Sequence, residues 1–262
     1  MISNTNDPAV KAVKRLAQRS RRDDAGVFLV EGPQAVRELL QHAPGSAVDV
    51  FYTAAFRDRF GSIVDLAERS PATVDEVSEK VLAEMADTVT PQGVIAVAQL
   101  IQKSLTDIED AKLIAICHEV RDPGNAGTVI RAADAAGADA VILTGDSVDL
   151  HNPKLVRAST GSIFHLTIVE HADLADVVEL LSDRGVQIFA ASADGQSIPE
   201  IRGQLAKPTA WLFGNEARGL DDTARELADT VVSVPIYGQA ESLNLATAAS
   251  VCLYASAFEQ RA

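Results

Sequence analysis

Three short segments place polar side chains directly after apolar runs, where chemistry is commonly done. The first, "RDPGNAGTVIRAADAAGADAVIL", is a turn followed by an alanine-rich helix that carries Asn125 and Arg131. The second, "WLFGNEARGL", contributes Glu216 after an apolar run. In the third, "VPIYGQAESLNLATAAS", Ser242 and Asn244 begin a long helix. An amide, a guanidinium, a carboxylate and a hydroxyl together suit the orientation of a polar substrate and the stabilisation of its charge.

The turn in the first segment resembles a nucleotide-binding loop, but its glycines have the wrong spacing. It has neither the GxGxxG pattern of a dinucleotide site nor the GKS/T of a P-loop. The absence of an acidic metal pair also disfavours a phosphotransferase. The two cysteines lack metal-ligand spacing, so we expect no metal cofactor.

Each of these polar residues also has a purely structural explanation. Asn125 could be a helix N-cap, and Ser242 with Asn244 could be simple capping residues. Arg131 could be a surface residue and Glu216 a loop carboxylate. All three segments nevertheless lie at strand ends of one predicted parallel sheet, where carboxyl-end loops gather in one crevice. Their joint occurrence favours a ligand site.

The elements that must position these residues fall into two domains, separated by the polar stretch "IQKSLTDIEDAK". We assign residues 1–104 to a small α/β sandwich and residues 111–262 to a larger α/β domain. Alternation of strands and helices in the second predicts a mostly parallel sheet covered on both faces. The expected strands are 27–30, 48–52, 73–74 and 94–100, with helices 33–42, 55–69 and 77–86, and then strands 113–118, 139–144, 187–191, 210–214 and 231–234.

Composition indicates a soluble protein. The chain has 262 residues and 47% apolar content, enough to bury sizeable cores. Cys117 and Cys252 lie far apart in apolar segments, as expected for buried, reduced thiols. We find no signal segment and no uncharged apolar run of the roughly 18 residues that a membrane span needs. We expect a cytoplasmic location.

The net charge of −14 argues against a general polyanion binder, yet the first 22 residues are basic. A helix capped by Asp7 would carry Val10, Val13 and Ala17 on one face and cations on much of the other. This helix is either a solvated surface or a local phosphate-contacting patch. The candidate contacts are Lys11, Lys14, Arg15, Arg19, Arg21 and Arg22.

In their order and spans, the three segments resemble the motifs of the SpoU, or TrmH-like, RNA ribose 2′-O-methyltransferases of the SPOUT class. The first domain is similar to the family's L30e-like substrate-binding domain through "VKAVKRLAQRSRRDDAGVFLVEGPQAVRELL". The resemblance implies a C-terminal parallel-sheet α/β domain closed by a deep trefoil knot. Knots are essentially absent from proteins, and the periodicity of this sequence does not suggest one.

The resemblance further implies that S-adenosylmethionine is the methyl donor and that RNA is the partner. Mapped by motif, the donor pocket includes Gly214, Val234, Ile236 and Leu243. Glycine lets the backbone come close to a ligand, and apolar neighbours can sandwich a flat ring. Ala191 stands where relatives often carry a threonine near the donor, so we expect no hydroxyl contact there.

The implied reaction must deprotonate a ribose 2′-hydroxyl and align it for in-line attack on a methyl group. Arginine is a poor base, so we expect Arg131 to orient the hydroxyl and to stabilise charge. Asn125 would position Arg131 or the ribose. Glu216, Ser242 and Asn244 would hold this array by hydrogen bonds.

A fourth segment, "NPKLVRASTGSIFHL", also looks similar to the family. Arg157 and Ser159 are expected to support an RNA phosphate or a subunit contact. His165, between Phe164 and Leu166, is expected to be a packed structural histidine.

The resemblance favours 23S ribosomal RNA as the substrate, with transfer RNA as the alternative. A non-catalytic RNA-binding paralogue is a further alternative. Such a paralogue would keep the fold and lose the polar residues of the three segments, all of which are present here.

The last long segment predicts an interface. No charged residue occurs from Leu243 to Phe258. As a helix it would be about 24 Å long, too short to span a bilayer. A surface helix should show a charged face, and this one does not. We expect a homodimer through the second domain, the alternative being that the first domain or the knot covers the helix.

Overall fold

The computed structural model describes all 262 residues, which divide into two compact units. The first comprises residues 1–101 and 149–165, and the second comprises residues 102–148 and 166–262. The segment 149–165, which the sequence analysis places in the second domain, packs as part of the first unit. None of the helices combines the length and apolar character needed to cross a membrane.

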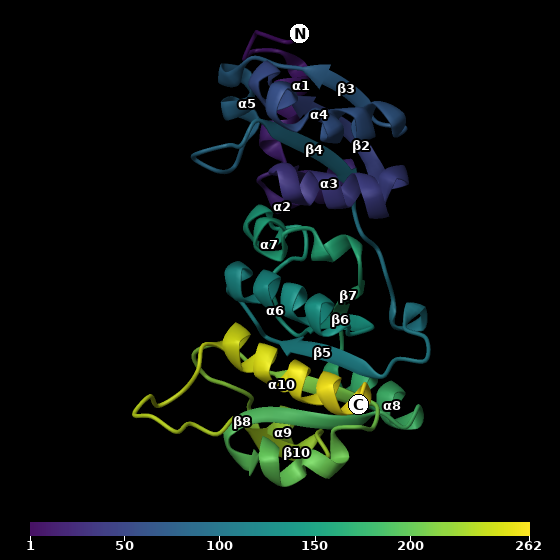
Figure 1. Ribbon diagram of the computed structural model, residues 1–262, viewed down its shortest axis with the longest axis vertical. Coiled ribbons are helices and arrows are strands. Elements are labelled where there is room, and N and C mark those ends of the chain that lie inside the picture. Colours follow the sequence, from purple (N-terminus) through teal and green to yellow (C-terminus); the bar gives the residue numbers. More distant parts are fainter. The chain divides into compact units, whose positions relative to one another are not determined.

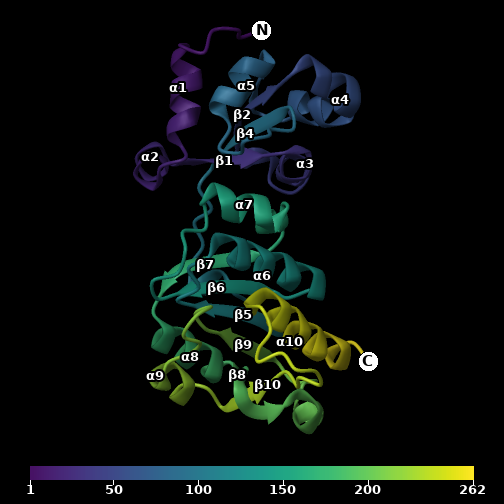
Figure 2. The same ribbon diagram turned by 90° about the vertical axis from the view of Figure 1, so that its left-hand side faces the viewer.

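A four-stranded mixed sheet with the order β1-β4-β2-β3 forms the centre of the first unit (Figure 1 labels β2, β3 and β4, and Figure 2 labels β1). Strand β4 runs antiparallel to β1 and β2, while β3 runs parallel to β2. The helices α1 and α5 pack on one face through Val10, Val81 and Leu82. The bounds are α1 Pro8–Arg15, α2 Arg19–Ala25, β1 Val27–Glu31, α3 Pro33–His42, β2 Ala47–Tyr52, α4 Ala54–Arg69, β3 Thr73–Glu76, α5 Glu79–Met85, β4 Val94–Gln99 and α7 Pro153–Ser159.

The basic N-terminal segment differs from the single helix that was expected. It forms two helices, α1 and α2, separated by Leu16 to Gln18. Asp7 caps α1 as predicted, with its side chain accepting from the Ala9 amide at 2.9 Å. Leu16 is buried in place of Ala17, because the helical spacing ends before Ala17 is reached.

The second unit is built on a six-stranded, all-parallel sheet with the order β10-β8-β9-β5-β6-β7 (Figure 2). Strand β7 is absent from the expected set, since it lies at the sheet edge and is only half-buried, with a correspondingly polar sequence. The bounds are β5 Leu113–His118, α6 Pro123–Ala136, β6 Ala140–Thr144, β7 Thr167–Ala172, α8 Leu174–Asp183, β8 Gln187–Ser197, β9 Thr209–Phe213, α9 Asp222–Glu226, β10 Thr230–Ser233 and α10 Leu245–Gln260.

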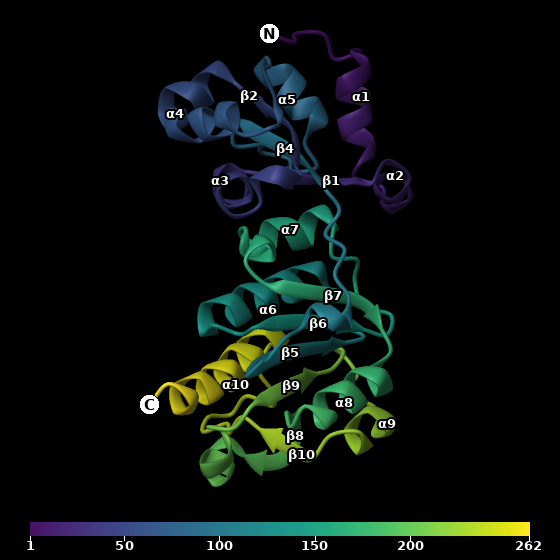
Figure 3. The same ribbon diagram turned by 90° about the vertical axis from the view of Figure 1, so that its right-hand side faces the viewer.

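Helices cover both faces of this sheet, as its apolar strands require. Figures 2 and 3 show α6 and α10 on one face and α8 and α9 on the other. Ile114, Ile188 and Leu212 form the core beneath α8 with Leu181. Because all six strands are parallel, β5, β9 and β10 end at the same edge of the sheet. The α/β fold with a parallel C-terminal sheet is therefore confirmed.

Candidate functional site

The start of α6 fixes the first polar segment. Asp122 is the N-cap, its side chain accepting from the Asn125 amide at 2.8 Å, and Pro123 occupies the first helical turn. Asn125 is therefore not the cap, and its side chain is left to make other contacts.

Glu216 ties the loop after β9 to this helix start. Its Oε1 accepts from the Asp122 amide at 3.0 Å, and its Oε2 accepts from the Arg121 amide at 3.3 Å. The Asn125 side chain reaches the same carboxylate, with Nδ2 at 3.5 Å from Oε1. An anion at a helix N-terminus is also favoured by the helix dipole. Glu216 is thus a bridge between two loops.

Asn244 has both a structural and a site role. Its Oδ1 caps α10 by accepting from the amides of Ala246 at 2.9 Å and Thr247 at 3.3 Å. Its Nδ2 donates to Asn125 Oδ1 at 3.0 Å. The structure therefore brings Asn125, Glu216 and Asn244 together from three segments far apart in the sequence. We call these three side chains the amide–carboxylate network.

Two predicted residues stand outside this network. Ser242 is exposed, and its side chain forms no hydrogen bond within the chain. Arg131 is also exposed and has no hydrogen bond or ion pair within the chain. It follows Asn125 by six residues on α6, which corresponds to about 9 Å along the helix axis. One protomer does not place the Arg131 guanidinium against Asn125.

Asn215 holds the shape of the loop, a role that the sequence analysis did not assign. Its Oδ1 accepts from the amides of Ala217 at 3.0 Å and Arg218 at 3.2 Å, and its Nδ2 donates to the Glu119 carbonyl at 2.9 Å. Arg218 also pairs with the Glu119 carboxylate at 2.8 Å. An asparagine between turn glycines is a recognisable signal for such bonding.

Gly214 is constrained by its own loop. A Cβ there would lie 2.4 to 2.6 Å from backbone atoms of Gly219 and Leu220. The amide and carbonyl of Asn215 pair with those of Gly219 in a short antiparallel bridge. The loop can therefore close only if residue 214 lacks a side chain, whether or not a ligand is bound.

The other expected donor residues lie within β8, directly after β10 and just before α10. Val234 and Ile236 follow β10, and Leu243 precedes the cap of α10. Ala191 follows Ala190, which pairs with β9. Ile236 and Leu243 are 36% and 37% exposed, so apolar surface is available to a flat ligand.

Arg22 is wrongly placed on the phosphate-contacting patch. It is 2% exposed, donates to the carbonyls of Leu16 at 2.7 Å and Ala17 at 3.0 Å, and forms an ion pair with Asp149. Burial opposes ionisation of Asp149, but hydrogen bonds from His151 and Arg22 outweigh it and hold the pKa of Asp149 well below its usual range. A cation held in this way anchors segment 149–165 and does not reach RNA.

The remaining basic residues lie on the surface, and several of them form ion pairs there. Lys14 pairs with Glu84 at 2.5 Å, whereas the Arg19–Asp23 and Arg21–Asp24 pairs are long, at 3.8 and 3.7 Å. Lys11 and Arg15 are exposed.

Arg157 and Ser159 serve the structure of the first unit. Arg157 pairs with the buried Glu31 at 2.6 Å and with Asp87 at 2.9 Å. Ser159 is buried and donates to the Val156 carbonyl at 2.8 Å. The His165 side chain is 24% exposed and contacts Glu38 and His42, so it is packed on one side only.

Both cysteines are free and buried, as predicted. Burial, with a smaller contribution from the charge of Glu216, raises the pKa of Cys117 to about 12. The thiol therefore stays protonated beside the site and is a poor nucleophile.

Comparison with known proteins supports the assignment of these motifs. The SpoU rRNA Methylase family model matches residues 112–254, and that of the MRM3-like substrate binding domain matches residues 7–96. The 23S rRNA (guanosine(2553)-2′-O)-methyltransferase of Bacillus subtilis (strain 168) is 33% identical, covering 97% of this chain and 97% of its own. The 23S rRNA (uridine(2479)-2′-O)-methyltransferase of Streptomyces viridochromogenes is 32% identical, covering 91% of this chain and 85% of its own.

The fold comparison agrees with the sequence comparison. The crystal structure of an AdoMet-bound rRNA methyltransferase from Sinorhizobium meliloti has a TM-score of 0.84 and 30% identity, covering 97% of this chain and 96% of its own. The match extends over both units, and the amide–carboxylate network lies within the region of the first family model. The chain therefore belongs to the SpoU rRNA methylase family.

Proposed function

We propose that this protein is an S-adenosylmethionine-dependent RNA ribose 2′-O-methyltransferase that acts on 23S ribosomal RNA. The observation that carries this proposal is the amide–carboxylate network, which joins all three motif segments at the carboxyl edge of the sheet. The names of the relatives from Bacillus and Streptomyces support the reaction and the substrate class. The donor bound to the Sinorhizobium relative supports the cofactor.

The residues of this chain fit such a donor. The apolar side chains of Ile236 and Leu243 are partly exposed, and the 214–219 loop is closed tightly on its own backbone. When bound, S-adenosylmethionine supplies an electrophilic methyl group for the ribose oxygen. Asn125, fixed by Glu216 and Asn244, would orient the sugar, while a guanidinium would hold the 2′-hydroxyl and its neighbouring phosphate. We retain the C-terminal knot as part of this proposal.

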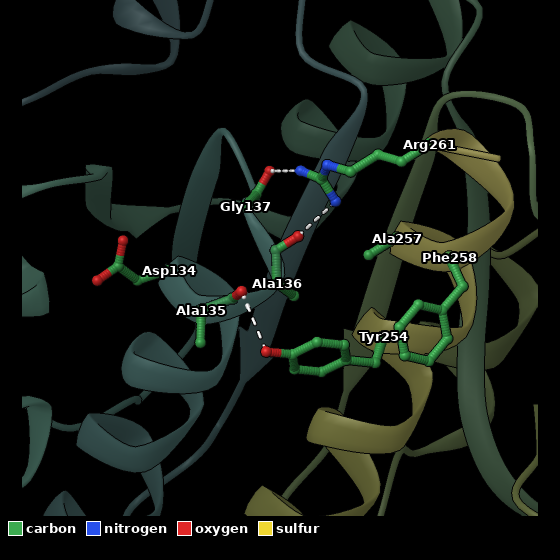
Figure 4. Close-up of a pocket in the computed structure, with 8 residues that line it drawn as sticks. All are labelled: Asp134, Ala135, Ala136, Gly137, Tyr254, Ala257, Phe258 and Arg261. Atoms are coloured by element: carbon green, nitrogen blue, oxygen red, sulfur yellow. Dashed lines mark hydrogen bonds between the residues drawn. The ribbon is translucent and has the colours of Figure 1, made fainter.

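A homodimer through α6 and α10 would complete this site. Val251, Tyr254 and Phe258 are 41%, 37% and 67% exposed and share one face of α10. The Tyr254 hydroxyl donates to the Ala135 carbonyl of α6 at 3.1 Å, beside a surface hollow of about 440 Å³ (Figure 4). Arg131 is exposed on the same helix α6. A partner could therefore bring its own Arg131 to the network, which one protomer does not do.

The two domains would then have separate tasks. Residues 1–104 would bind the RNA, and residues 111–262 would carry the donor and the chemistry. Lys11, Arg15, Arg19 and Arg21 remain as phosphate contacts, with Lys14 available if its surface pair with Glu84 opens. Arg22 and Arg157 are no longer part of this surface. We place the enzyme in the cytoplasm, where its proposed substrate is found.

The test is methyl transfer from labelled S-adenosylmethionine to RNA of cells that lack the gene. Purified 23S rRNA and transfer RNA are assayed separately, and the 2′-O-methyl positions are mapped. We expect label at one site in 23S rRNA and none with Asn125→Ala. Label in transfer RNA alone would overturn the substrate, and failure to bind the donor at millimolar concentration would overturn the reaction.

A further inference from the structure

Two histidines and a glutamate converge in the first unit, and none of them is among the residues of the amide–carboxylate network. Glu38 and His42 lie one turn apart on α3, and His165 follows the short helical turn Ser162–Phe164. The Oε2 atom of Glu38 is 3.4 Å from Nε2 of His42 and 3.2 Å from Nε2 of His165. The ligand atoms of all three residues lie within 4.8 Å of one another.

The 3.4 Å separation equals an edge of a metal-coordination tetrahedron, and the 3.2 Å separation, which also serves as a hydrogen bond, is slightly shorter than one. Zinc binds imidazole nitrogen and carboxylate oxygen at about 2.0–2.2 Å, so neighbouring ligand atoms in a tetrahedral site are about 3.3–3.5 Å apart. A good N–H···O hydrogen bond is shorter, with a usual range of about 2.7–3.2 Å. The 3.4 Å contact from His42 is therefore long for a hydrogen bond and suitable for a shared ion.

The carboxylate is oriented from its other side. Glu38 Oε1 accepts from Gln34 Nε2 at 2.8 Å and from the Arg37 guanidinium at 3.1 Å, which leaves Oε2 toward the two imidazoles. Outer partners of this kind commonly orient metal ligands. Arg37 carries positive charge near the site, but its side chain is 41% exposed and acts on the far oxygen, so water screens it.

Gly161 explains how His165 reaches α3. Its φ is +99°, and a Cβ there would lie 2.5 Å from both Cβ and Cγ of Glu38. Only glycine lets the backbone of this segment lie so close to the glutamate. The rings of His42 and His165 consequently meet edge to face, with centroids 4.3 Å apart.

We propose that Glu38, His42 and His165 bind one divalent transition-metal ion of the zinc class, with water in the fourth position. Two imidazoles and a carboxylate are a ligand set that suits zinc. The side chains of His42 and His165 are 51% and 24% exposed, which gives the ion a path from solvent. The ion ties segment 149–165 to α3, independently of methyl transfer.

The test uses the tag-free full chain, stripped with a chelator and then dialysed against micromolar zinc. Metal analysis should give one ion per chain, and cobalt in place of zinc should give the visible absorption of a tetrahedral site. His42→Ala and His165→Ala should each weaken zinc binding by about tenfold or more. His171→Ala is the matched control, because that histidine is 53% exposed in the second unit, and it should bind zinc like the natural chain.

Metal-free thermal unfolding of each variant separates lost ligands from lost folding. Because both histidines are partly exposed, we expect little change in that unfolding. The proposal is overturned if the natural chain takes up no zinc at micromolar concentration. Zinc binding that persists in both histidine variants, or that disappears in His171→Ala, would place the ion elsewhere and equally overturn it.

Discussion

Asn244 shows how one side chain can serve the fold with one atom and the site with another. Its oxygen caps α10, and its nitrogen donates to Asn125. The capping explanation that the sequence leaves open for Asn244 is therefore correct but incomplete. Helix capping and the contact with Asn125 can be separated by mutation. An aspartate at position 244 would keep the oxygen that caps the helix but would lack the N–H donor.

We predict that Asn244→Asp keeps stability but lowers methyl transfer by about tenfold or more. The new carboxylate still caps the helix, but it faces Asn125 Oδ1 as a second acceptor. If the Asn125 amide flipped to offer its NH₂ to the new carboxylate, its oxygen would face the Glu216 carboxylate instead, which is also an acceptor. Asn244→Ala loses both functions and should also cost about 1 kcal/mol of stability. Thermal unfolding and single-turnover methylation measure the two effects, and an active aspartate variant would exclude the positioning role.

Arg131→Ala should abolish methyl transfer while leaving donor affinity nearly unchanged. Its guanidinium is exposed and makes no hydrogen bond or ion pair within the chain, so the fold should tolerate its loss. Calorimetric titration with the donor, alongside the methylation assay, checks this. Parallel loss of both would show that Arg131 belongs to the donor site. Gly214→Ala cannot serve as the matching donor-site variant, because its Cβ would collide with the backbone of the 214–219 loop and disrupt the loop whether or not the donor is bound.

The sequence predicts network residues better than it predicts surface contacts. Asn125, Glu216 and Asn244 sit in motifs whose position after parallel strands brings them together. Arg22 and Arg157 look like surface cations in the sequence, since their acidic partners are supplied by distant segments. The same distance hides the Glu38 cluster, because His165 belongs to another part of the chain.

At the scale of elements, the pair of Arg22 with Asp149 links α2 to segment 149–165. The folded-state pKa of Asp149 is depressed, so its ionised form adds stability above its unfolded pKa of about 3.9. This contribution is lost as the pH falls through the folded value. Asp149→Asn leaves Arg22 buried without its partner charge.

We predict that Asp149→Asn lowers the free energy of unfolding by about 3 kcal/mol at pH 7. The gap from the natural chain should narrow as the pH falls below about 4, since the natural carboxylate then begins to lose its advantage. Urea unfolding of both proteins at several pH values measures this difference in the free energy of unfolding. An equal gap at pH 7 and pH 3 would contradict the ion pair as its cause.

The exposed cations of α1 and α2 should govern RNA affinity and its dependence on salt. Changing Lys11, Arg15, Arg19 and Arg21 to glutamine should weaken RNA binding and flatten the salt slope, because fewer counterions are released. Donor affinity should not change. Arg59→Gln with Lys207→Gln is a control on other exposed surface. Binding titrations with RNA at several salt concentrations measure this effect. An unaltered salt slope would show that α1 and α2 are a solvated surface that does not contact RNA.

Element positions follow the sequence most closely where burial is strongest. Strand β5 is an apolar run with only its last residue less than fully buried, and both its bounds were expected. Edge strand β7 has only two buried residues, Ile168 and Val169, and carries the charged Glu170, so its apolar pattern is weak. The extension of β8 to Ser197 is likewise polar and half-exposed, and tertiary pairing with β10 defines it.

At the scale of the whole molecule, the boundary between units is not a single point in the sequence. Asp149 to His165 packs in the first unit although segments of the second flank it. The composition of this segment does not predict that it packs in the first unit, because its apolar residues could fit the core of either unit. Arg22, Arg157 and Gly161 supply the contacts that hold it, and their partners are visible only in three dimensions.

The last prediction concerns the dimer. The face of α10 toward the sheet buries Ala249, Cys252 and Leu253, which leaves Tyr254 and Phe258 exposed on a helix that has no charged residue before Glu259. Exposed apolar surface of this kind is typical of an interface. Tyr254→Glu with Phe258→Glu should therefore convert a dimer into a monomer and abolish methylation, since Arg131 of the partner would be lost from the site.

Light scattering at micromolar concentration measures the mass, and methylation is assayed on the same samples. Val89→Glu is the matched control, because Val89 is fully exposed in the first unit and should tolerate the charge without a change of mass or activity. Mixing inactive Arg131→Ala with inactive Asn125→Ala should restore part of the activity, because one site of each mixed dimer then has both groups. A natural chain that is monomeric and still methylates RNA would refute the shared site, and an absence of restored activity in proven mixed dimers would place Arg131 in its own protomer's site.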